Sequence, residues 1–158
     1  MIKGNIITPE KALQRAQALC AKQERCSNDI RLKLIQWQII TNEAEKIIRK
    51  LIADGFVDDE RYARMFVRDK SKFNKWGPIK ITYTLRSKRI SEDVIKSALH
   101  EIVSADDTSL RELMQRKLKN LKAKSPYELK IKLIRFGVSR GYEYNLANTL
   151  ASSIINEH

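Results

Sequence analysis

The chain has few of the residues that build catalytic, metal or redox sites. It contains two histidines and two cysteines in 158 residues. Cys20 and Cys26 are too far apart for a CxxC redox pair and too few for a zinc site. His100 and His158 have no partner at metal-ligand spacing and no nucleophile arrangement beside them. The sequence therefore predicts no catalytic residue, no metal and no cofactor, and we expect a protein that is not an enzyme.

Other absences restrict the fold and the location. Five glycines and three prolines interrupt the chain too rarely for a β-rich fold, and no glycine-rich loop indicates nucleotide binding. No apolar run approaches the ~18 residues of a membrane helix, and the N-terminus lacks a signal-peptide core. Two isolated cysteines do not indicate an oxidising compartment. We expect an all-α, cytoplasmic, monomeric protein that does not associate with membranes.

Positive charge is abundant and evenly distributed. The net charge is +12, and each of the ranges 1–57, 58–105 and 106–158 carries +4. A disordered basic tail would instead gather its charge at one end. The excess therefore belongs to the folded body and favours an acidic partner.

One apolar pattern occurs three times. A shift of 51 residues, then one of 48, relates fifteen apolar positions. They are Ile30, Leu34, Ile39, Ile48 and Leu51; Ile81, Leu85, Ile90, Leu99 and Ile102; and Leu129, Leu133, Val138, Ala147 and Leu150. Their spacing places two on a middle helix and two on a final helix of each copy. A leading helix precedes each pair, at about 9–23, 58–72 and 107–122.

Three three-helix repeats follow from this pattern, with boundaries at 1–57, 58–105 and 106–158. Thr41, Ser91 and Ser139 are expected to cap the final helices, and Ser125 with Glu128 forms a capping box. A unit of about 50 residues has a marginal core alone, so we expect neighbouring units to stack. The predicted architecture is an elongated, curved tandem array; the alternative is one compact bundle.

A helix junction near the middle of the chain is the most informative local signal. Gly55 can end a helix in the left-handed conformation, and Asp58 and Asp59 suit the start of the next one. Tyr62 and Phe66 then give that helix a buried face. Asp58 and Asp59 also form the chain's one tempting acidic pair, but capping explains them better than metal binding does.

Basic side chains are the functional candidates. The proposed partner-binding residues are Arg64, Arg68, Lys70, Lys72, Lys75, Lys80, Arg86, Lys88, Arg89, Lys119, Lys122, Lys130, Lys132 and Arg135. Within this set, Lys70–Trp76 places cations beside Phe73 and Trp76. One interpretation is that these two aromatic residues, with the cations, bind acidic loops or phosphates with stacked bases of a partner. The other is that they pack together as a small satellite core. Reversing the charges of Lys72, Lys75, Arg86 and Lys88 is the corresponding test.

The junction sequence from Gly55 to Val67, followed by Trp76-Gly77-Pro78-Ile79, resembles the RecX family of bacterial RecA modulators. The motif positions that carry this resemblance are Gly55, Asp58, Asp59, Tyr62, Ala63 and Gly77. The likeness covers nearly the whole chain and is strongest over 51–102. Arg89 departs from it, because many relatives have glycine before the apolar position of Ile90.

The resemblance implies a role in recombination, DNA repair and the SOS response. Family members resemble curved stacks of three-helix repeats in the groove of the RecA–single-stranded DNA filament. There they inhibit strand exchange, ATP hydrolysis and co-protease activity; ATP is the cofactor of RecA. Two alternatives remain open: a protein that binds nucleic acid directly without RecA, and a scaffold for another acidic protein. Weak DNA binding is compatible with the main hypothesis.

Overall fold

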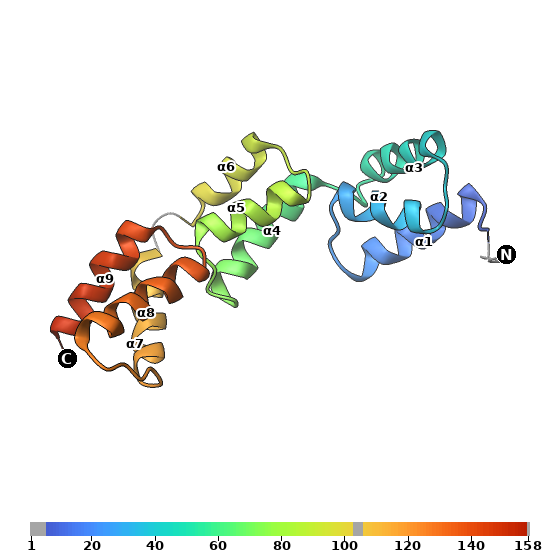
Figure 1. The fold of residues 1–158 in the computed structure, drawn as a ribbon. Helices are drawn as coiled ribbons and strands as arrows, with labels where there is room; N and C mark the ends of the chain where they lie inside the picture. The colour runs from blue at the N-terminus through green and yellow to red at the C-terminus, as the bar shows by residue number, and fades with distance from the viewer. Residues whose placement is uncertain (1–5, 103–105, 158) are drawn as a thin grey trace. The chain divides into compact units, whose positions relative to one another are not determined.

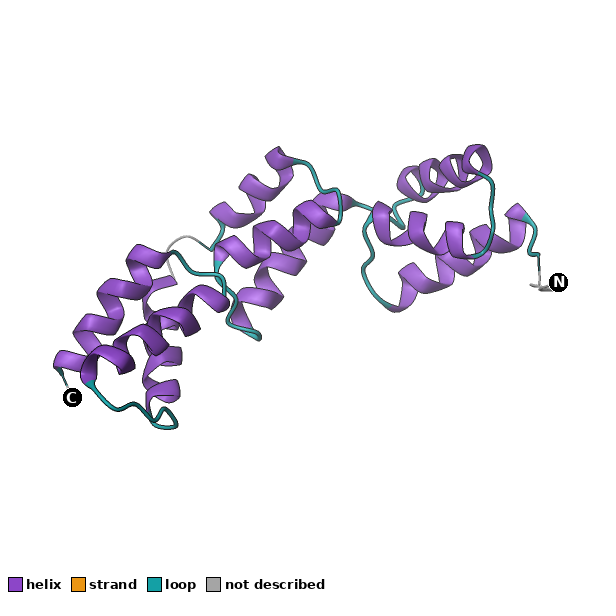
Figure 2. Cartoon of the chain, viewed as in Figure 1, coloured by secondary structure: helices purple, strands orange, loops and turns teal. Residues whose placement is uncertain are grey.

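The computed structural model describes residues 6–102 and 106–157, and every regular element in these ranges is an α-helix (Figures 1 and 2). The helices are α1 (Pro9–Lys22), α2 (Ser27–Gln36), α3 (Thr41–Ala53), α4 (Asp59–Lys72), α5 (Pro78–Ser87), α6 (Glu92–His100), α7 (Asp106–Leu118), α8 (Pro126–Ser139) and α9 (Tyr144–Asn156). The predicted all-α repeat fold is confirmed. Its elongation and curvature, and the three-part division, stay predictions.

The chain forms two compact units. The first comprises the described residues up to Ala63 together with Lys88–Ile90, and the second comprises Arg64–Ser87 and the described residues from Ser91 onward. In the first unit α1 and α2 both pack on α3 around a core that includes Ala16, Ile30 and Leu51. The turn after α5 therefore packs with the first unit although α5 itself belongs to the second.

The last three helices pack around a hydrophobic core within the second unit. α7, α8 and α9 each pack against the other two. Leu110, Met114, Leu133 and Ala147 are fully buried there. Gly137 lies inside this core, where a Cβ would be only 2.9 Å from Met114 Cε. The small residue thus permits close packing of α7 on α8.

The helix starts confirm part of the capping prediction. The hydroxyls of Ser91 and Ser125 each accept a backbone N–H from three residues ahead, at 3.4 and 3.1 Å. Thr41 was predicted wrongly as a cap, because α3 begins at Thr41 and follows Ile40, which has no capping side chain. Ser139 was also predicted wrongly. It ends α8 and donates its hydroxyl to the Phe136 carbonyl, at 2.7 Å.

The spacing between the second and third repeats changes inside α8. α5 has 10 residues and α8 has 14, so α8 carries about one additional helical turn. The shift of 48 therefore relates the starts of α5 and α8, whereas a shift of 52 relates Glu92 to Tyr144, where the final helices begin. Val138 was predicted wrongly as a core position and is 45% exposed. Tyr142, 3% exposed, takes the place equivalent to Ile90.

When the shift of 52 residues is used for the end of α8, all three repeats have a residue with a left-handed backbone conformation after the middle helix. Gln38, Arg89 and Gly141 have φ of 62, 60 and 96°. Glycine adopts this conformation without steric cost, whereas residues with a Cβ adopt it with strain. A glycine at the position of Arg89 would therefore adopt this conformation without that strain.

Candidate partner-binding surface

The two acidic motif residues, Asp58 and Asp59, each cap the start of a helix. The Asp58 carboxylate accepts the N–H of Arg61 at 3.0 Å and caps α4. Asp59 instead accepts both the N–H and the hydroxyl of Ser27, each at 2.7 Å, and so caps α2. Gly55, at φ +79°, ends α3 as expected. Among the described residues, no three His, Cys, Asp or Glu side chains are grouped to hold a metal.

Gly77 marks a backbone junction within the second unit. Its N–H donates to the Arg140 carbonyl at 2.7 Å, and the N–H of Ile79 donates to the Gly141 carbonyl at 2.9 Å. A Cβ on Gly77 would lie 2.4 Å from the Gly141 oxygen. Only glycine permits this approach, which gives the motif position its physical role.

Side chains reinforce the same junction. The Arg140 guanidinium donates to the Asn74 carbonyl at 2.5 Å, and the Tyr142 hydroxyl donates to the Lys75 carbonyl at 3.2 Å. We call residues 140–142 the inserted turn and residues 74–80 its acceptor segment. Sequence analysis missed this pairing. The glycines at 77 and 141 were its local signals in the sequence.

The first unit has a turn at the equivalent place, where side-chain contacts are seen. Residues 88–90 are its inserted turn, and the Lys88 ammonium bonds the Asp29 carboxylate at 2.9 Å and lies 5.7 Å from the Tyr62 ring centroid. Although burial lowers the pKa of Lys88, the hydrogen bonds and charges of Asp29 and Tyr62 raise it above its ordinary value. Beside this pair, burial raises the pKa of the Cys26 thiol to about 11. Lys88 therefore stays charged, and Cys26 stays a neutral thiol.

Reversing Lys88 should destabilise the first unit. The Lys88 and Asp29 side chains are only 28% and 21% exposed. Lys88→Glu would place two carboxylates together and remove a charged hydrogen bond, so we expect the free energy of unfolding to fall by about 2 kcal/mol. Urea denaturation measures this. Adding Asp29→Lys should restore part of the loss, and an unchanged midpoint for Lys88→Glu would contradict the assignment.

Of the two aromatic residues in the Lys70–Trp76 segment, one packs against other side chains of the protein and the other lies exposed at the surface. The Lys70 and Lys80 ammonium groups lie 4.8 and 4.4 Å from the half-buried Trp76 ring, and Phe66 meets it edge-on at 6.3 Å. Trp76 is therefore a packed residue. Phe73 is 71% exposed, with Lys72 5.4 Å from its ring. Phe73 and Lys72 remain available to a partner.

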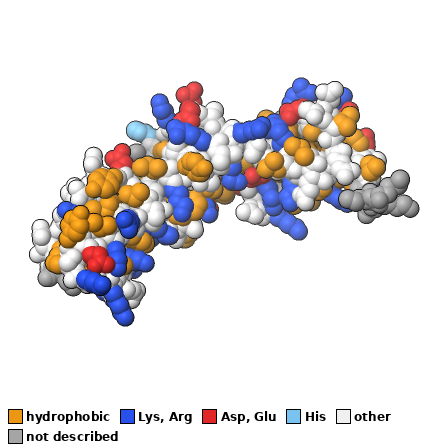
Figure 3. All heavy atoms as spheres, viewed as in Figure 1, with side chains coloured by type: hydrophobic (Ala, Val, Ile, Leu, Met, Phe, Trp, Pro, Cys, Tyr) orange, Lys and Arg blue, Asp and Glu red, His pale blue; other side chains and the backbone are white. Residues whose placement is uncertain are grey.

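Three exposed cations form a row on α4. Arg64, Arg68 and Lys72 follow one another at intervals of four residues and therefore share one helix face. None of them makes an ion pair with a residue that the structure describes. We call these three residues the α4 basic row. Figure 3 shows Lys and Arg side chains on the visible face of both units.

Other predicted cations divide into engaged and exposed groups. Arg86 makes two bonds to Glu92, at 2.6 and 3.0 Å. The Lys132 ammonium lies 3.2 Å from a carboxylate oxygen of Glu128 and donates a hydrogen bond to the Lys122 carbonyl. Lys75 and Lys130 are half-buried. The exposed remainder comprises Arg89, Lys119, Lys122 and Arg135. The structure thus gathers only part of the predicted set on one helix face.

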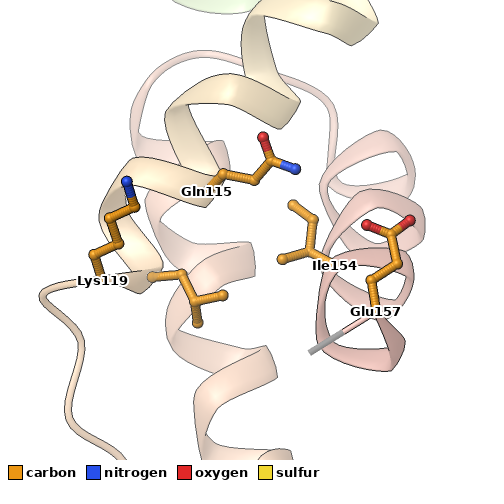
Figure 4. A pocket seen from close by; sticks show the side chains of 5 residues that line it. Gln115, Lys119, Ile154 and Glu157 are labelled. Atoms are coloured by element: carbon orange, nitrogen blue, oxygen red, sulfur yellow. The ribbon is translucent and has the colours of Figure 1, made fainter.

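The described part of the second unit has hollows between its helices. One hollow of about 400 Å³ is lined by Gln115, Leu118, Lys119, Ile154 and Glu157. Figure 4 shows it between α7 and α9. No helix of the described residues is long and apolar enough to cross a bilayer.

Comparison with known proteins gives consistent matches. Sequence models of the second and third three-helix domains of RecX match residues 58–99 and 105–150. Regulatory protein RecX of Clostridium botulinum Alaska E43 is 31% identical, over 93% of this chain and 68% of the relative. The Clostridium perfringens strain 13 protein of that name is also 31% identical, but the chain spans only 64% of its length.

Solved structures show the same fold. The crystal structure of RecX from Lactobacillus salivarius superimposes with a TM-score of 0.80 at 20% identity, covering 95% of this chain and 97% of that one. A second RecX crystal structure gives a TM-score of 0.83 at 22% identity, covering 95% of this chain and 73% of the other.

Proposed function

The chain belongs to the RecX family of regulatory proteins, and on this premise we propose that it binds RecA or its filament on single-stranded DNA. Binding inhibits the recombinase, ATPase and co-protease activities. The role is regulatory rather than enzymatic, and the protein acts as a cytoplasmic monomer.

The α4 basic row is the observation that carries this proposal. Arg64, Arg68 and Lys72 are exposed on one face, while Lys88 and Arg86 are held by Asp29 and Glu92. A partner with acidic groups or phosphates gains favourable contacts along such a row. Repeated helical units can add several weak contacts, because each one raises the effective concentration of the next.

Inhibition should weaken as salt rises. Exposed charges are screened over about 8 Å at physiological ionic strength and over shorter distances above it. We therefore expect the concentration that half-inhibits RecA to increase several-fold between low and physiological salt. RecA-dependent ATP hydrolysis in a salt series measures this. The salt sensitivity of RecA alone is the control, and a half-inhibitory concentration that does not change would contradict cationic docking.

One experiment separates this proposal from direct nucleic-acid binding. RecA-dependent ATP hydrolysis and filament length would be measured with and without the protein at several excesses of DNA. A protein that acts on RecA continues to inhibit when DNA is abundant. If added DNA alone abolishes inhibition, the protein acts by sequestering DNA, and the RecA proposal fails.

A further inference from the structure

The third repeat has a segment equivalent to the acceptor segment 74–80, but no described residues pack on it as an inserted turn. In the second repeat, residues 74–80 hold the inserted turn 140–142. Since Pro78 and Pro126 both begin a middle helix, residues 122–128 are the equivalent segment of the third repeat. The N–H groups of Ser125 and Tyr127, equivalent to those of Gly77 and Ile79, bond no residue that the structure describes.

A hollow occupies this place. It has a volume of about 400 Å³, and its lining includes the apolar side chains of Leu121, Pro126, Leu129 and Ile155. A second hollow of about 290 Å³ shares Pro126 and Ile155 with it and extends along Tyr127, which is 74% exposed. The third repeat therefore presents an apolar groove where the second repeat holds a protein turn.

Positive charge surrounds this groove. Between residues 119 and 132 there are five lysines and one carboxylate, Glu128. Lys124 lines the first hollow and Lys130 the second. The Glu128 carboxylate is already bonded to the Lys132 ammonium and to the N–H of Lys124. The charge at the rim of the groove is thus strongly cationic.

We infer that this groove, formed by residues 121–130 and 152–156, docks an acidic protein segment that carries a large apolar side chain. The apolar side chain of this segment would lie between Leu121, Leu129 and Ile155. The two inserted turns of this chain provide the precedent, because each ends in a buried apolar residue: Ile90 is 5% exposed and Tyr142 is 3% exposed. Asp or Glu residues on either side of it meet Lys124 and Lys130.

Charge and chemistry favour this occupant over two others. A second copy would bring further positive charge to a cationic rim, because every repeat carries an excess of lysine and arginine. A nucleic acid would satisfy the lysines but would leave the aliphatic lining without an apolar group to bury. The equivalent segment of the second repeat binds a protein turn.

A peptide titration tests the inference on the full chain. The probe is a short synthetic peptide of Asp and Glu with a central Leu-Phe pair, and the control peptide has Ser-Ser in its place. In nitrogen-15-edited NMR spectra, the Leu-Phe peptide should shift the amide signals of 121–130 and 152–156. The Ser-Ser peptide should bind at least about tenfold more weakly, because it buries no apolar side chain. Equal binding of both peptides, or shifts elsewhere, would overturn the inference.

Two variants locate the site. Ala123→Trp fills the hollow from an exposed loop position, and Lys124→Glu with Lys130→Glu reverses the rim charge. Each should weaken peptide binding at least about tenfold. Ala21→Trp and the pair Lys11→Glu and Lys96→Glu are matched controls on exposed faces of α1 and α6, and they should bind normally. Concentration-dependent self-association that Ala123→Trp abolishes would instead assign the groove to a second copy.

The peptide experiment contains no recombinase, so its result is independent of the proposed function. If the chain inhibits RecA but does not bind the peptide, the inference fails and the proposed function stands. If the peptide binds in the groove and RecA is unaffected, the inference stands and the proposed function fails.

Discussion

Replacing Gly77 by alanine is expected to lower the free energy of unfolding of the second unit by about 3 kcal/mol. The new Cβ would lie 2.4 Å from the Gly141 oxygen, 2.5 Å from its carbonyl carbon and 2.7 Å from the N atom of Tyr142. All three are backbone atoms, so no flexible side chain can move aside. Relief of the clash would require separating the inserted turn from its acceptor segment.

Gly55 provides the matched control for this prediction. It has φ of +79°, but a Cβ there would have no atom within 4 Å. Gly55→Ala should therefore cost only about 1 kcal/mol, from backbone strain alone. Urea denaturation followed by circular dichroism measures both variants. If the two glycines prove equally sensitive, conformational strain rather than close approach explains Gly77.

Reversal of the α4 basic row should have the largest effect on function. Arg64→Glu, Arg68→Glu and Lys72→Glu together should raise the half-inhibitory concentration for RecA at least about tenfold, because each contact with an acidic partner becomes repulsive. Helicity and thermal stability should change little, since the three side chains are exposed and make no ion pair with a described residue. RecA-dependent ATP hydrolysis measures the effect.

The control for this variant has the same change in net charge. Lys11→Glu, Arg49→Glu and Lys96→Glu reverse three exposed cations that lie on other helices and outside the predicted set. We expect these changes to leave most of the inhibition intact. If the control variant loses as much as the α4 variant, overall charge is responsible rather than this helix face. Arg86 and Lys88, first chosen from the sequence, are unsuitable because their reversal also breaks ion pairs.

Periodicity predicted the helices well but could not locate the insertion in α8. Apolar spacing correctly placed Ile30, Leu85 and Leu133 in cores, because burial of one helix face imposes that pattern. One extra helical turn keeps the same face inward, so Val138 looked like a core position in the sequence. Its exposure became visible only once the end of α8 was known.

Residue types and their spacing along the chain were enough to predict the all-α repeat architecture, the helix junction between Gly55 and Asp58, and the even positive charge. Each depends on residue type and on neighbours within a few turns of chain. The folded structure was needed to show that Lys88 bonds Asp29, that Gly77 meets Gly141, and which cations remain exposed. The Lys88–Asp29 contact spans 59 positions of the sequence, and the Gly77–Gly141 contact spans 64. The conformational preferences of neighbouring residues do not specify which distant group will pair with a charge or pack into a space.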